Sequence, residues 1–252
     1  MNTNSNTYTV IYSVILVVVV AAVLAFAAMF LKPIQDDNVK KDTISQILAA
    51  ATVESGADIL ATYRNDIEAA ILVNLEGEKV GELSIENCEV YDNSELKKQI
   101  AADQKALPVY IFKNGITVVP CYGAGLWGPI WGYIGFEGDH KTIKAVCFGH
   151  KGETPGLGAK IADEPSFAAG FAGKKMGENE ILFEVAKPAN RQTVESGVDA
   201  ISGATITCQA LGKTLNQWFG FYQNYLTKNG IKEVVDEVLD LNVEIVNAVE
   251  EK

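Results

Sequence analysis

The longest apolar run of the sequence lies near its N-terminus. Residues 1–31 carry no charged side chain, and Val10 to Leu31 are almost wholly apolar. A helix of about 22 residues is about 33 Å long, which matches the hydrocarbon core of a bilayer. The alternative is a cleaved signal peptide, but this run exceeds the usual apolar region of such a peptide and no basic segment precedes it. The pattern predicts an uncleaved anchor over residues 1–35, with one transmembrane span at about 10–31.

Charges next to this span bear on its orientation. Lys32, Lys40 and Lys41 follow the run, and nothing basic precedes it. The positive-inside rule therefore weakly favours a cytoplasmic position for the rest of the chain.

Beyond the apolar run, hydrophobic residues return at helical spacing between Lys40 and Asn74, which predicts one or two helices. Two hairpins are then expected. One covers residues 70–83 around the turn Glu76-Gly77-Glu78, and the other covers residues 107–120 around Asn114-Gly115, the strongest short hairpin signal of the sequence. The helical positions are Ile44, Ile47, Leu48, Ala51, Ile59, Leu60 and Tyr63.

The segment between the hairpins, residues 86–106, has the composition of a polar linker followed by a short helix. Further strands are expected over residues 131–136, 142–148 and 181–186. After Thr205, apolar residues continue at helical spacing for about five turns, and residues 231–249 have the pattern of a second amphipathic helix with an acidic face.

These elements predict an α+β fold, an antiparallel sheet with flanking helices, preceded by one N-terminal transmembrane helix. We expect residues 36–252 to form a single domain that includes the C-terminal amphipathic helix. Its size is compatible with a substantial core, because 48% of the 252 residues are hydrophobic.

Composition excludes some classes of function. The chain has 21 basic and 32 acidic residues, a net charge of -11, so we expect no nucleic-acid partner. The four cysteines show neither zinc nor iron–sulfur spacing, and His140 and His150 are too isolated in sequence to indicate a metal site.

The stretch Asp199-Ala-Ile-Ser-Gly-Ala-Thr205 lies where an extended region meets a long amphipathic helix. Gly203 and Ala204 leave room before a threonine whose hydroxyl would be exposed at the start of that helix. Unpaired N–H groups and the positive end of the helix dipole favour a phosphate at this position. A plain N-cap is the alternative interpretation, because serine and threonine are common there.

Two glycine-rich loops precede this stretch. Residues 125–128 read Gly-Leu-Trp-Gly, and residues 152–158 read Gly-Glu-Thr-Pro-Gly-Leu-Gly. Glycines allow backbone N–H groups to approach the edge of a flat ring, and Thr154 could donate a hydroxyl. Tight turns are the alternative, and Trp127 or Trp131 could either stack on a ring or pack in the core.

The Asp199-x-x-Ser202-Gly203-Ala204-Thr205 pattern resembles the covalent flavinylation motif of the FMN-binding domain family. With the anchor and the two loops in this order, most of the chain resembles the family of the C subunit of the sodium-translocating NADH:quinone reductase. The resemblance implies an FMN joined through its phosphate to the Thr205 hydroxyl by a separate flavin transferase that uses FAD and magnesium. It also implies that the second loop lies beside the isoalloxazine ring. The flavin-binding candidates are Asp199, Ser202, Gly203, Ala204, Thr205, Glu153, Thr154, Gly156, Leu157, Gly158 and Trp127.

The resemblance further implies a protein that relays electrons inside a sodium-pumping complex, with other membrane subunits as partners. It places the chain in the cell inner membrane as a single-pass protein with its main domain in the periplasm, against the weak lysine bias. Two alternatives remain open. One is the G subunit of the related Rnf-type ferredoxin:NAD oxidoreductase, which shares the motif and the anchor, and the other is a flavin-free membrane-anchored scaffold.

Overall fold

A computed structural model describes residues 6–177, 181–192 and 194–250. The chain forms two compact units, Met1–Asp42 and Thr43–Lys252. Helix α1 (Asn6–Ala50) begins in the first unit and ends in the second. Among the described residues it is the one helix long and apolar enough to cross a membrane, and its most apolar window has a mean hydropathy of 3.2. The predicted span lies inside it.

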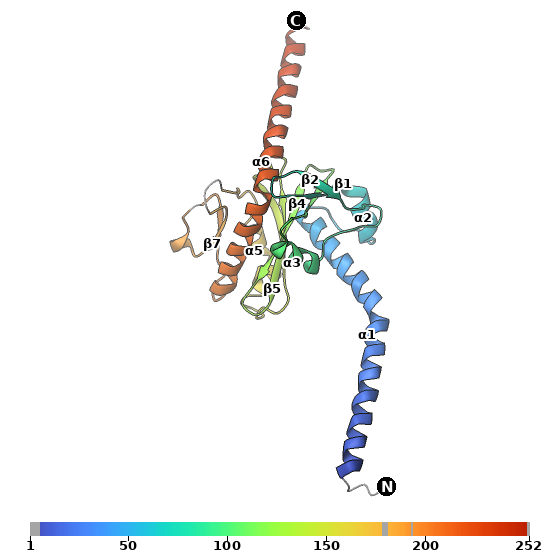
Figure 1. The fold of residues 1–252 in the computed structure, drawn as a ribbon. Helices are drawn as coiled ribbons and strands as arrows, with labels where there is room; N and C mark the ends of the chain where they lie inside the picture. Colours follow the sequence, from blue (N-terminus) through green and yellow to red (C-terminus); the bar gives the residue numbers. More distant parts are fainter. Residues whose placement is uncertain (1–5, 178–180, 193, 251–252) are drawn as a thin grey trace. The chain divides into compact units, whose positions relative to one another are not determined.

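The second unit is built on a six-stranded sheet, drawn as arrows in Figure 1. Its strand order is β2-β1-β3-β4-β5-β6. Every neighbouring pair of strands is antiparallel. The strands are β1 (Ile67–Val73), β2 (Lys79–Glu82), β3 (Leu107–Phe112), β4 (Thr117–Ala124), β5 (Pro129–Phe136) and β6 (Ile143–His150).

The structure confirms both predicted hairpins. β1 pairs with β2 across Gly77, and β3 pairs with β4 across Gly115. The φ angles of Gly77 and Gly115 are 75° and 80°, a conformation that residues with a Cβ rarely adopt. The α+β class with an antiparallel sheet and flanking helices is therefore correct.

Successive side chains of a strand point to opposite faces of the sheet, and here they enter two different hydrophobic clusters. Helices cover the sheet on both faces and contribute to these clusters. In β5, Tyr133 belongs to one cluster and Ile134 to the other. The Tyr133 cluster includes the end of α1 and Tyr63 of helix α2 (Ile59–Asp66). The Ile134 cluster includes helices α3 (Asn93–Ala101), α4 (Lys160–Asp163), α5 (Pro165–Ala169) and α6 (Thr205–Glu250).

Helix α6 crosses the sheet and packs against β4 and against a small second sheet (Figure 1). This second sheet pairs β7 (Glu184–Ala186) in parallel with β8 (Gly197–Asp199). Asn216 joins α6 to the start of β7, because its Oδ1 accepts from the N–H groups of Leu182 and Phe183 at 2.6 and 3.1 Å. The short helix η1 (Pro188–Asn190) lies between β7 and β8 in the chain. β8 therefore delivers the chain directly to the start of α6.

The C-terminal region differs from the prediction. The sequence predicts two helices after Thr205, whereas the structure has one helix of 46 residues, with Gly230 inside it. A single internal glycine costs about 1 kcal/mol, which is too little to end a long helix. The predicted acidic face of residues 231–249 lies outside the side chains that the structure describes.

Candidate functional site

The turn between β8 and α6, residues 199–205, is called the attachment turn below. The Ala204 carbonyl accepts the first helical hydrogen bond, from the Cys208 N–H at 2.9 Å, so α6 begins at Thr205. Among the described residues, the N–H groups of Thr205, Ile206 and Thr207 have no protein acceptor, either from the backbone or from a capping side chain. The helix thus presents unpaired donors and the positive end of its dipole, which suit an anion.

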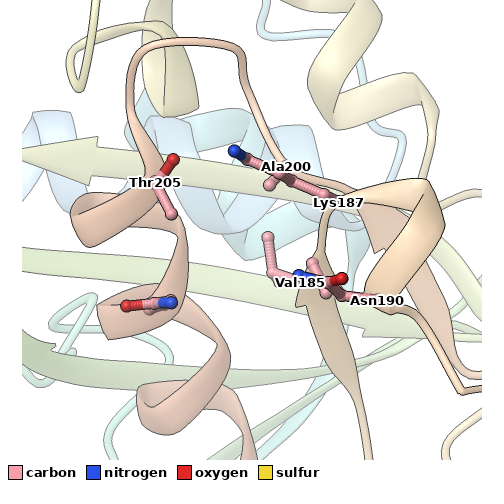
Figure 2. Close-up of a pocket in the computed structure, with 7 residues that line it drawn as sticks. Val185, Lys187, Asn190, Ala200 and Thr205 are labelled. Carbon is pink, nitrogen blue, oxygen red and sulfur yellow. The ribbon is translucent and has the colours of Figure 1, made fainter.

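The Thr205 side chain borders a pocket of about 210 Å³ (Figure 2). In the figure the Thr205 hydroxyl and the Lys187 side chain extend toward each other across the pocket. The pocket is lined by Val185, Ala186, Lys187, Asn190, Ala200, Thr205 and Gln209. A group attached to the Thr205 oxygen therefore has room on this side.

The second glycine-rich loop lies against the attachment turn. Gly203 has φ +81°, and a methyl group at this position would lie 2.9 Å from Leu157 Cδ2. Only glycine combines this backbone conformation with such a close approach. The structure thus brings Leu157 and Gly203, 46 residues apart in sequence, into direct proximity, as the predicted site requires.

The carboxylate of Glu153 links the two glycine-rich loops to the helix that follows the attachment turn. Its Oε1 accepts from the Trp127 N–H at 2.9 Å, and its Oε2 accepts from the Thr207 hydroxyl at 2.7 Å. Glu153 is 4% exposed and Thr207 2% exposed. This arrangement, called the Glu153 clasp below, fixes both glycine-rich loops to the first turn of α6.

Electrostatics agree with an ionised clasp. Burial raises the pKa of the Glu153 carboxyl, but hydrogen bonds from the Trp127 N–H, the Thr207 hydroxyl and the Leu126 N–H outweigh burial, and nearby His150 adds to their effect. The net pKa is lower than the ordinary value, so Glu153 is negatively charged at neutral pH. Its two oxygens are occupied by the protein itself, which favours a positioning role over direct contact with a ligand.

Two glycines make space for this carboxylate. A methyl group at Gly125 would lie 2.5 Å from Glu153 Oε1, and one at Gly158 would lie 2.5 Å from Oε2. Gly128, by contrast, has no atom closer than 3.6 Å to such a methyl group. The glycine pattern of the loops is therefore partly explained by the need to admit Glu153.

Large apolar side chains are exposed around the attachment turn. Trp127 is 69% exposed, and Leu126, Leu157 and Ile206 are between 44% and 57% exposed. Trp131 differs from Trp127, because it packs against Gly149 and donates from Nε1 to Gln46 at 2.9 Å. Of the two tryptophans, Trp127 is the one available for stacking on a ring.

The remaining predicted residues lie close to this region. Asp199 accepts from Arg191 Nη1 at 2.8 Å, and Ser202 is exposed in the turn. Thr154 is also exposed, and its carbonyl accepts from the N–H groups of Leu157 and Ala159, which closes the loop around Gly156. Direct contact of these residues with a flavin stays a prediction.

Sequence reasoning missed Thr207, Arg191 and Lys187. Thr207 lies two residues beyond the motif, and a buried threonine in a first helical turn is a weak signal, since it also occurs as a helix cap. Arg191 and Lys187 lie in a segment without a motif. Only the parallel pairing of β7 with β8 brings them beside the attachment turn.

A small-residue turn that opens a long helix beside two glycine-rich loops is the arrangement of an FMN-binding domain. The FMN-binding domain family matches residues 125–220, which contain both loops and the attachment turn. The chain belongs to the family of the C subunit of the Na(+)-translocating NADH-quinone reductase.

Two relatives and two solved structures support this assignment. The C subunit of the Haemophilus ducreyi reductase is 30% identical over 79% of this chain and 83% of its own length. Its counterpart in Neisseria meningitidis serogroup B is 31% identical over 82% and 87%. The crystal structure of the same subunit from Parabacteroides distasonis has a TM-score of 0.67 at 32% identity and covers 78% of this chain and 97% of its own. NqrC of Shewanella oneidensis has a TM-score of 0.62 at 26% identity, with 76% and 98% covered.

Proposed function

We propose that this chain is a membrane-anchored flavoprotein subunit of a sodium-translocating NADH:quinone reductase, with FMN joined covalently to Thr205. The observation that carries the proposal is the attachment turn. The Thr205 hydroxyl lies beside a pocket, at a helix start whose first three N–H groups have no acceptor among the described residues, and Gly203 of the same turn approaches Leu157. An FMN phosphate on this oxygen would gain hydrogen bonds and a favourable helix dipole.

Attachment requires a transfer from FAD, because the resemblance implies a flavin transferase. In that reaction the Thr205 oxygen would form a bond to the phosphorus of the FMN half, the bond to the AMP half would break, and the hydroxyl proton would be released. Thr205 is then a tether and takes no part in electron transfer. When bound, the FMN would supply the redox chemistry by accepting and passing on electrons.

The protein would determine how the flavin is held. The Glu153 clasp fixes the two loops relative to α6, and Trp127 and Leu157 offer exposed apolar surface for the ring. Thr154 is exposed, and its hydroxyl could donate to the flavin. NADH oxidation would take place in another subunit of the complex, since this sequence has no dinucleotide-binding motif.

A matched pair of variants tests the attachment. The full chain is co-expressed with a flavin transferase, and flavin is detected by fluorescence on a denaturing gel and by intact mass. We expect Thr205→Val to abolish the label, because no oxygen remains to form the bond. Thr207→Val makes the same change in the same helical turn. It should keep the label while lowering stability by about 1.5–3 kcal/mol, because the buried Glu153 carboxylate loses a hydrogen-bond donor.

The control without the transferase should be unlabelled for every variant. A covalent flavin that persists in Thr205→Val would contradict the assignment. A wild-type chain that stays unlabelled beside an active transferase would favour the flavin-free scaffold.

We also propose that α1 anchors the chain in the inner membrane and that the domain faces the periplasm. Its apolar segment is long enough to span a bilayer. Ser94, exposed at the start of α3, offers a position for an engineered cysteine, while the four native cysteines are buried or half-buried. A membrane-impermeant thiol reagent should label Ser94→Cys in intact cells. Labelling only after lysis would contradict the periplasmic orientation.

A further inference from the structure

The pocket beside Thr205 has a mixed lining that the proposed attachment does not by itself explain. Val185, Ala186 and Ala200 are small apolar residues, whereas Lys187, Asn190 and Gln209 bring one ammonium and two carboxamides. None of its seven lining residues is aromatic. The lining thus offers little for a flat ring to stack on, and the exposed Trp127 lies outside it.

The Lys187 ammonium lacks an acidic partner among the described residues. Asp199, the one acidic residue of the attachment turn, is paired with Arg191. Lys187 begins the segment that leaves β7, and its carbonyl accepts from the Asn190 N–H at 2.8 Å, so the backbone beneath the side chain is fixed. Figure 2 shows its side chain directed toward Thr205. A cation that has no acidic partner among the described residues, on the same pocket as the oxygen that would carry the phosphate, can meet a negative charge there.

The chemistry of the lining matches one part of the cofactor. A phosphodiester on Thr205 carries one negative charge, which the Lys187 ammonium can pair. The ribityl chain has hydroxyl groups that both donate and accept, as the carboxamides of Asn190 and Gln209 do. Its carbon chain can lie against Val185 and Ala200.

We propose that this pocket binds the phosphate and ribityl part of the FMN, with Lys187 pairing the phosphodiester charge, while the ring lies outside on the apolar side chains. This inference rests on the proposed attachment to Thr205. It assigns a separate role to each side of the attachment turn: the pocket on the β7 side holds the polar part of the cofactor, and the glycine-rich loops face its ring.

The test uses the full chain, loaded by co-expression with the transferase and purified in detergent. Lys187→Met and Lys187→Arg are compared with Lys213→Met, which removes an exposed lysine of α6 that does not line the pocket. Two measurements are made: the ³¹P resonance of the phosphodiester, and the decay of flavin fluorescence anisotropy, which reports nanosecond motion of the cofactor. Neither depends on electron transfer.

We expect Lys187→Met to shift the ³¹P resonance and to raise the fraction of flavin with fast local motion about two- to fivefold, as expected for loss of one partly exposed ion pair. Lys187→Arg and Lys213→Met should resemble the wild type. A folded Lys187→Met chain that cannot be loaded, beside a Lys187→Arg chain that can, would also support a required charge at this position.

The outcomes that overturn the inference are separate from those that overturn the attachment. A wild-type chain without added FMN mass removes the attachment itself. If a loaded Lys187→Met chain has an unchanged ³¹P resonance and an unchanged anisotropy decay, the proposed role of the pocket is refuted, while the attachment to Thr205 is not. Equal effects in Lys187→Met and Lys213→Met would indicate a general effect of net charge and would also refute it.

Discussion

The Glu153 clasp and the attachment turn meet within one turn of α6. The polar groups of the clasp are hydrogen-bonded within the protein, whereas the N–H groups that the turn presents at the start of α6 lack protein acceptors among the described residues. In the clasp, Glu153 and Thr207 are buried and hydrogen-bonded to each other, and Trp127 donates its N–H. In the turn, the Thr205 side chain is only partly buried, and the first N–H groups of the helix have no protein acceptor among the described residues. Buried polar groups are normally satisfied by the protein, and unsatisfied ones at a helix start indicate a place for water or a ligand.

This difference separates residues that a sequence motif places together. Thr205 and Thr207 are two residues apart on the same helix, but one is available for chemistry and the other is used for architecture. Likewise, Glu153 and Thr154 are neighbours, and only Thr154 has a side chain exposed toward solvent. Proximity to a motif is therefore weak evidence that a side chain contacts the cofactor.

The clasp predicts a large loss of stability when its carboxylate is removed. Glu153→Ala would leave the Thr207 hydroxyl and the Trp127 N–H without acceptors inside the protein, at a cost of about 2–5 kcal/mol. We expect this loss in urea unfolding of the detergent-solubilised chain, followed by near-ultraviolet circular dichroism. Glu164→Ala is the control, because the contacts of the Glu164 carboxylate are exposed: an ion pair with Lys160 and a hydrogen bond from the Ser166 hydroxyl at 3.1 Å. Together they should contribute at most about 1 kcal/mol. If the two variants lost the same free energy of unfolding, Glu153 would contribute no more to stability than an exposed surface carboxylate.

A smaller loss is expected from filling the space that the clasp needs. Gly125→Ala would place a methyl group 2.5 Å from Glu153 Oε1 and 2.7 Å from Ile130 Cγ2. Overpacking of this kind costs about 1–3 kcal/mol. Gly128→Ala, in the same loop, meets nothing closer than 3.6 Å and should leave the urea midpoint nearly unchanged. If Gly128→Ala were the more harmful of the two, these glycines would be needed for a reason other than room for Glu153.

Much of the fold could be predicted from local signals. The two hairpins follow from the turns at Gly77 and Gly115, and the first helix follows from its apolar run, because each depends on residues that are adjacent in sequence. The short helices α4 and α5 and the three-residue strand β8 were not predicted, since segments of three to five residues carry too little periodicity. The sequence also fails to predict the length of α6. Its apolar pattern is interrupted before residue 231, but the backbone stays helical through that point.

The site was predictable as a set of motifs and not as a set of roles. The attachment turn and both loops were recognised from their residues, and the structure brings them together. The role of Glu153 depends on partners 26 and 54 residues away, and that of Lys187 depends on the pairing of β7 with β8. No local pattern encodes these contacts.

The smallest expected effect concerns the charge of the clasp and depends on pH. The folded-state pKa of Glu153 is below its ordinary value, because the hydrogen bonds from Trp127 and Thr207 outweigh burial. The ionised carboxylate therefore stabilises the fold above the ordinary glutamate pKa of about 4.3, and this contribution is lost as the pH falls through the lower folded-state value. Glu153→Gln keeps an acceptor for the Trp127 N–H and cannot ionise.

The free energy of unfolding of the wild type should exceed that of Glu153→Gln most at neutral pH, and the gap should narrow below about pH 4.5. All other acidic residues are shared by the two chains, so their titration contributes equally to both curves. If the two curves of unfolding free energy against pH were parallel across this range, the charge of the Glu153 carboxylate would not contribute to stability. In that case the hydrogen bonds of the clasp, and not its charge, would distinguish it from the attachment turn.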